Sequence, residues 1–389
     1  MQRNIKLLAL LNVFLGLRLF SPIAILYFTG VTGSFALGMS IFAVTQVASA
    51  FFEVPTGVFS DFIGRRNTII LGSFAAFLSV FFYALGGSYW LLFAGAVLEG
   101  LSLSFFSGNN DAFLYDTLKE REKEREYHTF LGKVSSTYGV AGGVSAVLAG
   151  IISIESLHLV VWASVFPQVA LVITSFFLVE PRIHSRKSGN IYRHLKESFA
   201  VFLQNRKLRN LSIANFLSYG IGESAYQFFP SFFVSLLPVW AVSFVRALPN
   251  INSAIGYYFS GKLIDRFAQL PLLIVGYSYA RIIHLLSLLF PTILSPFLMS
   301  TSSFFHGITD TAKNSLIQKE FTDHQRATMG SVSSLGSTLT YAIASIGLGL
   351  LADATSPNIA LIAVQVSFIP IILMYIWIFK KYRYDKANT

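Results

Sequence analysis

The sequence has no cysteine among its 389 residues, and only 12% of its residues carry a charge. The absence of thiols excludes disulfide bonds, thiolate metal sites and a cysteine nucleophile. Soluble domains carry about 25% charged residues, so this chain has too few of them to cover a water-exposed surface. The composition therefore indicates a protein that is embedded in the lipid bilayer.

Sequence motifs for catalysis and for nucleotide or metal binding are also missing. The chain has no Walker A pattern, no G-x-S-x-G turn and no cluster of metal-ligating residues. We therefore expect no enzyme activity, no cofactor, no metal site and no ATP-driven pump acting alone. The formal net charge of +10 would favour nucleic acid as a partner of a soluble protein. In a membrane protein the basic residues of the loops set the orientation of the spans instead, so we expect no nucleic acid partner.

Long apolar runs recur along the whole chain, in which apolar residues make up 54% and the mean hydropathy is +0.61. About 17–25 such residues suffice for a helix to cross a bilayer. The runs predict an all-α integral membrane protein with twelve transmembrane helices. We place these spans at 6–28, 36–59, 68–86, 90–112, 131–153, 157–179, 209–232, 239–260, 269–290, 293–315, 328–351 and 359–379.

Lysine and arginine residues are concentrated on one side of these spans. With a cytoplasmic N-terminus, all 29 Lys and Arg lie in cytoplasmic segments except Arg18, Arg246 and Arg281, which lie within spans. Cytoplasmic segments of membrane proteins carry an excess of Lys and Arg. We therefore expect a multi-pass protein with both termini in the cytoplasm, whose basic loops face membrane lipids.

The longest cytoplasmic segment, 180–208, divides the chain into six spans on each side. Its residues Tyr192–Leu203 place Leu195, Phe199 and Phe202 at helical spacing, which predicts an amphipathic helix at the membrane surface. We predict three parts, namely an N-terminal six-helix bundle at 1–179, a cytoplasmic linker at 180–208 and a C-terminal six-helix bundle at 209–389.

Short sequence matches relate the two halves of the chain. Three segments of the first half recur in the second half, in the same order and at nearly the same spacing: Gly57–Asp61 as Gly261–Asp265, Gly108–Asp111 as Gly307–Asp310, and Gly132–Ser136 as Gly330–Ser334. The matches imply that spans 2, 4 and 5 correspond to spans 8, 10 and 11. Parallel six-span repeats are suited to rocking about a central binding site.

The segment Gly57–Arg66, between predicted spans 2 and 3, resembles the signature of the major facilitator superfamily. The family pattern is glycine, three residues, aspartate, a basic residue, one residue, glycine and two basic residues, and Phe62 replaces the first basic residue here. The second copy keeps Gly261 and Asp265–Arg266 and has Ala268 where the second glycine would fall. The resemblance covers essentially the whole chain and implies two six-helix bundles related by a pseudo-two-fold axis.

The same resemblance assigns a gating role to this loop. Gly57 would permit close approach of span 2 to a neighbouring helix, and Asp61 would accept hydrogen bonds at a helix N-terminus. Gly64 would allow a tight turn, and Arg65 would pair with Asp116 at the inner end of span 4. The predicted gating residues are Gly57, Asp61, Gly64, Arg65, Arg66, Asp116, Gly261, Asp265 and Arg266.

Ionisable side chains within the spans are costly, at about 2.5–3.5 kcal/mol each near the bilayer centre, and so they need a reason. Arg18 and Glu99 lie at similar depth, and we expect an ion pair that serves either structure or transport. Asp310 shares a helix face with Lys313, which favours a structural pair. Glu223 has no evident partner in its own span, which suits proton exchange. The predicted substrate- and proton-binding residues are Arg18, Glu99, Glu223, Arg281 and Asp310.

These features together predict a secondary transporter of small molecules that works by rocker-switch alternating access. Glu53–Gly57 and Ala112–Asp116 resemble a bacterial drug-efflux-like branch, which favours proton-coupled export of amphipathic compounds across the plasma (inner) membrane by a monomer. Ala96 stands where proton antiporters of the family carry an arginine. Uptake of a nutrient or metabolite, by symport or facilitated diffusion, is therefore the alternative. A lipid translocase or a non-transporting receptor is the alternative of another class.

Overall fold

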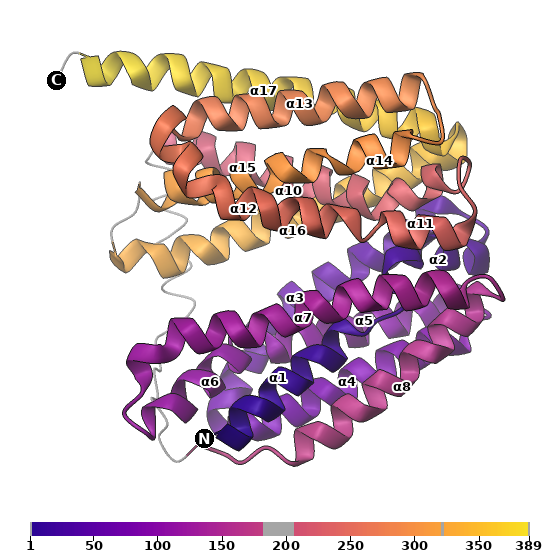
Figure 1. Ribbon diagram of the computed structural model, residues 1–389, viewed down its shortest axis with the longest axis vertical. Coiled ribbons are helices and arrows are strands. Elements are labelled where there is room, and N and C mark those ends of the chain that lie inside the picture. The colour runs from indigo at the N-terminus through magenta and orange to yellow at the C-terminus, as the bar shows by residue number, and fades with distance from the viewer. Residues whose placement is uncertain (1, 182–205, 320–322, 388–389) are drawn as a thin grey trace. The chain divides into compact units, whose positions relative to one another are not determined.

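The computed structural model describes residues 2–181, 206–319 and 323–387 of the chain (Figure 1). The described residues form helices and short connections, with no strand among them. The amphipathic helix predicted at 192–203 lies outside the described residues. The chain folds into two compact units. One unit comprises Met1–Ser188 with Val239–Phe244, and the other comprises Gly189–Pro238 with Val245–Thr389.

Helices cover each of the twelve spans predicted from the sequence. In the first half they are α1 (Gln2–Gly16), η1 (Ser21–Ile23), α2 (Ala24–Thr32), α3 (Phe35–Ile63), α4 (Arg65–Leu85), α5 (Tyr89–Phe106), α6 (Asn109–Lys119), η2 (Glu124–Glu126), α7 (Tyr127–Ile152) and α8 (Leu157–Phe176). In the second half they are α10 (Arg206–Phe233), α11 (Val239–Val245), α12 (Leu248–Phe267), α13 (Gln269–Leu289), α14 (Ser295–Ser300), α15 (Ser302–Lys319), α16 (Asp323–Ala354) and α17 (Pro357–Ala387).

Four of the predicted spans are interrupted rather than continuous. Span 1 breaks between α1 and α2, span 4 between α5 and α6, span 8 between α11 and α12, and span 10 between α14 and α15. The break in span 4 is made by Gly108 in the left-handed region, at φ +67°. Proline starts the helix after the break in spans 1 and 8. Breaks at membrane depth occur where the backbone is buried in protein or lines a cavity.

Nine helical segments of the described residues are long and apolar enough to cross a membrane. The three predicted spans not among them are 209–232, 239–260 and 293–315, which correspond to α10, α11–α12 and α14–α15. These spans carry the ionisable residues Glu223, Arg246 and Asp310. Their lower hydropathy therefore reflects a polar interior face, which the second unit presents to a cavity.

Helix packing repeats between the two units. The pairs α3–α5, α1–α7 and α4–α8 of the first unit correspond to α12–α15, α10–α16 and α13–α17 of the second. Small residues permit the closest approach in both: a Cβ added at Gly100 of α5 would lie 2.5 Å from the carbonyl oxygen of Thr45, and one at Gly307 of α15 would lie 2.5 Å from that of Ser253. This repeated packing agrees with the sequence repeat.

Candidate functional site

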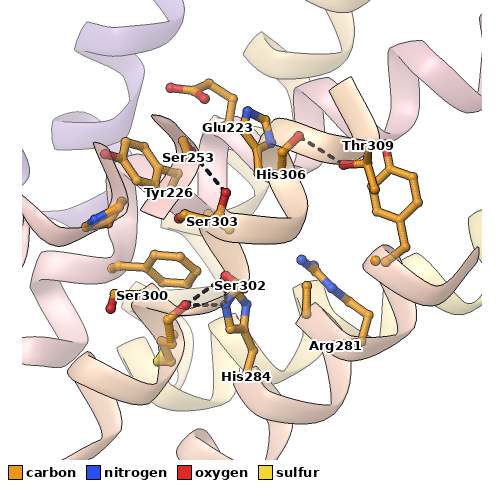
Figure 2. A pocket seen from close by; sticks show the side chains of 18 of the residues that line it. Glu223, Tyr226, Ser253, Arg281, His284, Ser300, Ser302, Ser303, His306 and Thr309 are labelled. Carbon is orange, nitrogen blue, oxygen red and sulfur yellow. Dashed lines mark hydrogen bonds between the residues drawn. The ribbon is translucent and has the colours of Figure 1, made fainter. Parts of the chain in front are cut away.

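A cavity of about 320 Å³ lies within the second unit. Its walls come from α10, the end of α11, α12, α13, α14, α15 and α17, so all of its lining residues belong to the second unit. Aromatic side chains and ionisable side chains line it together (Figure 2). The ionisable residues are Glu223, Arg246, Arg281, His284, His306, Asp310 and Lys313.

Helix α10 contributes the carboxylate of Glu223 to the cavity wall. Gln227, one helical turn further on, donates a hydrogen bond from its Nε2 to Glu223 Oε1 at 2.9 Å. The prediction that Glu223 has no partner in its own span is therefore wrong, because residues at i and i+4 meet on one helix face. Glu223 also interacts electrostatically with Tyr219 of α10 and His306 of α15.

Arg246 lies at the break between α11 and α12 and lines the cavity. It is 6% exposed, and its guanidinium carbon stands 3.7 Å from the ring centroid of Tyr226. Its terminal nitrogen donates a hydrogen bond to the backbone oxygen of Tyr226 at 3.0 Å. Its Nε is buried and has no hydrogen-bond partner among the described residues. The break between α11 and α12 thus directs the guanidinium of Arg246 into the cavity, where it packs on the ring of Tyr226.

Helix α13 directs Arg281 and His284 toward the cavity, one turn apart (Figure 2). The guanidinium carbon of Arg281 lies 3.9 Å from the ring centroid of Phe368 of α17. His284 Nε2 lies 2.9 Å from Ser302 Oγ and 3.3 Å from the carbonyl oxygen of Met299. His284 therefore binds the chain where span 10 is interrupted, beside Thr301.

Asp310 and Lys313 of α15 form the ion pair expected from their spacing. Lys313 Nζ lies 3.2 Å from Asp310 Oδ1. The other oxygen, Oδ2, accepts hydrogen bonds from the hydroxyl of Tyr257 at 3.1 Å and from the amide of Asn314 at 3.3 Å. The charge of Asp310 is thus compensated by its own helix and by α12.

The first unit contains a separate cluster around Glu99. Arg18, which lies in the break of span 1, forms an ion pair with Glu99 Oε1, as the sequence predicted. Tyr83 donates a hydrogen bond to Glu99 Oε2 at 2.7 Å, and Thr45 Oγ1 lies 3.5 Å from the same oxygen. Arg18 and Glu99 side chains are 19% and 16% exposed. The positive charge of Arg18 and the negative charge of Glu99 therefore neutralise each other inside the bundle.

The loop of the family signature contains the expected turn and the expected ion pair. Gly64 adopts φ +89°, and Arg65 Nε lies 3.8 Å from Asp116 Oδ2. Arg66 donates hydrogen bonds from its guanidinium to the backbone oxygens of Leu178 at 2.7 Å and Phe176 at 2.9 Å. These contacts tie the loop to α6 and to the end of α8.

Other predictions for this signature are not met or lie outside the described residues. Among the described residues, a Cβ added at Gly57 would meet no heavy atom within 4 Å, so the close approach expected there is not seen; the same space surrounds Gly261. The tight α3–α5 contact lies at Gly100 instead. The side chain of Asp61 lies outside the described residues. Asp265 and Arg266 are exposed at the end of α12.

Two contacts of the signature loop and the cavity were not predicted from the sequence. Glu180 accepts hydrogen bonds from the first backbone amides of α4, and Gln227 binds Glu223. The Gln227 contact follows from i, i+4 spacing. The Glu180 contact joins positions far apart in the chain and had no sequence signal.

Comparison with known proteins identifies the family. The family model described as Major Facilitator Superfamily matches residues 7–345. An uncharacterized MFS-type transporter of Methanocaldococcus jannaschii is 23% identical over 354 residues, covering 88% of this chain and 89% of that protein. Multidrug resistance protein 2 of Bacillus subtilis is 26% identical over 288 residues, covering 69% of this chain and 68% of that protein.

Solved structures share the fold at low sequence identity. A mutant of the nucleoside transporter NupG superposes with a TM-score of 0.81 at 13% identity, covering 97% of this chain and 100% of that one. A bacterial homolog of the human lysosomal transporter Spinster, inward-facing and unoccupied, gives 0.76 at 14% identity, with 98% and 97% coverage. The chain therefore belongs to the Major Facilitator Superfamily and is a multi-pass secondary transporter, not an enzyme.

Proposed function

We propose that this transporter exports amphipathic molecules in exchange for protons and that Glu223 carries the proton. The observation that supports this assignment is the contact of Glu223 with Gln227, at 2.9 Å, inside the cavity of the second unit. An amide partner is neutral, so protonation of Glu223 breaks no ion pair. Glu99 and Asp310, by contrast, are each bound to a cation.

The surroundings of Glu223 suit reversible protonation. Tyr219 lies on the same helix, and α15 presents His306 and Asp310 to the same region. The cation that α15 adds to the cavity wall, Lys313, is bound to Asp310. Intramembrane acids that face a cavity serve as proton relays in transporters.

The lining of the cavity supports an amphipathic substrate. Rings of Tyr226, Phe229 and Phe368 stand beside serine hydroxyls and charged groups. Pockets that combine apolar walls with a few convergent polar groups bind small organic molecules. The similarity to a protein named for multidrug resistance agrees with this substrate class.

The contacts of the signature loop support a latch at the cytoplasmic side. We propose that the parts 1–179 and 209–389 rock as bundles, joined by the linker 180–208, with both termini in the cytoplasm. The loop Gly57–Arg66 then makes and breaks the inner latch. Its attachment to Asp116, Leu178 and Glu180 supports this role, because it makes the loop move rigidly with the first unit.

Proton coupling is tested in proteoliposomes of the purified full chain with imposed pH gradients. An antiporter accumulates substrate when the lumen is acidic, and a symporter does so when the outside is acidic. The probes are 1-anilinonaphthalene-8-sulfonate and ethidium, with a trapped dye that reports lumenal pH. We expect accumulation with an acidic lumen, and its loss in Glu223→Gln while probe exchange without a gradient persists.

Glu155→Gln is the matched control, because Glu155 is exposed in the loop between α7 and α8 and lies outside the cavity. It should behave like the wild type. Undiminished pH-driven accumulation in Glu223→Gln would remove Glu223 from the mechanism. Accumulation only with an acidic exterior would establish symport and replace export with uptake.

A further inference from the structure

The cavity of the second unit contains two guanidinium groups without a carboxylate partner. No carboxylate oxygen of the described residues lies within 4.0 Å of Arg246 or Arg281. Each guanidinium instead faces an aromatic ring, at 3.7 Å for Arg246 and 3.9 Å for Arg281. Burying a charge without a counter-ion is costly in free energy, so the presence of these two arginines in the cavity needs a functional explanation.

The hydrogen-bonding capacity of these groups is mostly unused. An arginine has five N–H donors. Arg246 uses one of its terminal nitrogens on the backbone oxygen of Tyr226, and its Nε is buried without a partner. Arg281 makes no hydrogen bond with the described part of the chain, and its Nε is buried as well. Several donors are therefore available to a bound molecule.

The charges around the cavity leave a positive excess. Three basic residues and two acidic residues line it, with the histidines counted as neutral. Lys313 and Asp310 bind each other, and Glu223 binds Gln227. The remaining cations are the two arginines, one on α13 and one at the break before α12. A buried cation with open donors favours an anion that can be bound in a planar, bidentate manner.

The first unit provides an internal comparison. There a cation of span 1, Arg18, is neutralised by a carboxylate of span 4, Glu99. In span 10, which corresponds to span 4, the residues at the equivalent depth are Leu298, Met299 and Ser300. The second unit thus has the arginines of its cavity on spans 8 and 9 and no carboxylate at this position of its fourth span.

We propose that this cavity binds the anionic group of an amphipathic substrate, such as a carboxylate, sulfonate or phosphate, through Arg246 and Arg281. The apolar body of the substrate then contacts the rings of Tyr226, Phe229 and Phe368, which line the same space. This inference rests on the proposed function, in that it names the charge class of the exported molecule. It makes amphipathic anions the substrates and organic cations poor ligands.

Binding of three matched probes to the purified full chain tests the charge class. The probes are 4-phenylbutyrate, its neutral amide 4-phenylbutanamide and the cation 4-phenylbutylamine, measured by calorimetry and by thermal shift at pH 7.5. A ligand that binds the folded state raises its apparent stability. We expect saturable binding of the carboxylate, weakened about tenfold or more in the amide and absent for the amine.

Substitution of the two arginines tests the residues. Arg281→Gln and Arg246→Gln should each weaken 4-phenylbutyrate binding by about tenfold, because each removes charge-assisted hydrogen bonds. Arg281→Lys and Arg246→Lys keep the charge and should bind with intermediate affinity. These variants also serve if a glutamine variant fails to fold. Lys262→Gln removes an exposed cation of α12 outside the cavity and should bind like the wild type.

The outcomes separate this inference from the proposed function. Equal or tighter binding of the amine, or full carboxylate affinity in both glutamine variants, would overturn the anion site. In that case pH-driven flux that depends on Glu223 would still stand on its own. A competition measurement distinguishes a lipid as the source of the anion. In that case lysophosphatidate would compete with 4-phenylbutyrate, and inorganic phosphate would not.

Discussion

Glu180 binds Arg66 through the backbone, with the Arg66 amide donating a hydrogen bond to Glu180 Oε2 at 2.6 Å. The neighbouring amide of Arg65 donates to Oε1 at 2.8 Å, so one carboxylate satisfies the first two amides of α4. An anion at this position is stabilised by the helix dipole. A residue just beyond the last helix of the first half therefore caps the helix that follows the signature turn.

Replacement of Glu180 should destabilise the first unit. Glu180→Ala leaves two helix amides without an acceptor, and loss of such a cap costs about 0.5–2 kcal/mol. We expect a lower apparent Tm in detergent, with Glu180→Gln intermediate because it keeps an acceptor and loses the charge. Glu155→Ala, at an exposed position, serves as the control. An unchanged Tm in Glu180→Ala would mean that water replaces the carboxylate without cost.

The ion pair of Arg18 and Glu99 should behave as a coupled unit. Glu99→Gln leaves the guanidinium of Arg18 in a mostly buried site with no carboxylate, and Arg18→Gln leaves the carboxylate of Glu99 with the Tyr83 hydroxyl but without a cation. Residues that contact each other show interaction free energies of about 0.5–3 kcal/mol in double-mutant cycles. A double-mutant cycle measured by thermal denaturation should show that the double variant is more stable than the sum of the single losses predicts. Additive losses would show that solvent already screens the pair.

The helical spans and three ion pairs could be predicted from the sequence. Apolar runs set the spans because the bilayer fixes their length. Arg18–Glu99 follows from equal depth, Lys313–Asp310 from helical spacing, and Arg65–Asp116 from the family resemblance. Each of these pairs can be recognised from the sequence, because it depends on spacing along one helix, on depth within the bilayer or on a known motif.

The interruptions and the cavity could not be predicted in the same way. Hydropathy does not distinguish a continuous span from one that breaks at Arg18 or Arg246, because the flanking residues are equally apolar. The formation of a cavity by five spans of one unit depends on tertiary packing. Arg246 was not among the candidate site residues predicted from the sequence for the same reason. Its place in the site follows from its packing on the ring of Tyr226, which only the structure shows.

Ala268 should be a strained residue whose replacement by glycine stabilises the second unit. It adopts φ +61° and ψ 168°, close to the φ +89° and ψ 161° of Gly64 at the matching turn of the first unit. This region is essentially restricted to glycine, and other residues there incur about 1–3 kcal/mol of strain. Ala268→Gly should therefore raise the apparent Tm.

A matched control for this change is Ala254→Gly, on an exposed face within α12. Glycine inside a helix costs about 1 kcal/mol, so this variant should have a lower Tm. The opposite signs of the two Ala→Gly changes separate backbone strain from a general effect of glycine. A lower Tm for Ala268→Gly would show that the flexibility gained by the unfolded chain outweighs the strain relieved.

Gly100 should tolerate no side chain, because α3 packs directly against it. An added Cβ would lie 2.5 Å from the carbonyl oxygen of Thr45 and 2.7 Å from the backbone nitrogen of Ser49, and neither atom can move aside without shifting the helix. Overpacking of this kind costs about 1–3 kcal/mol. Gly100→Ala should therefore lower the Tm and, through the displaced α5, weaken the Glu99–Arg18 pair.

Gly139 of α7 provides the comparison, since an added Cβ there would meet no atom within 4 Å. Alanine is favoured over glycine in a helix by about 1 kcal/mol, so Gly139→Ala should leave the Tm unchanged or raise it. Thermal denaturation of both variants in one detergent decides the matter. Equal effects at the two positions would mean that α3 and α5 are free to separate, and the close packing assigned to Gly100 would then not hold the Arg18–Glu99 cluster together.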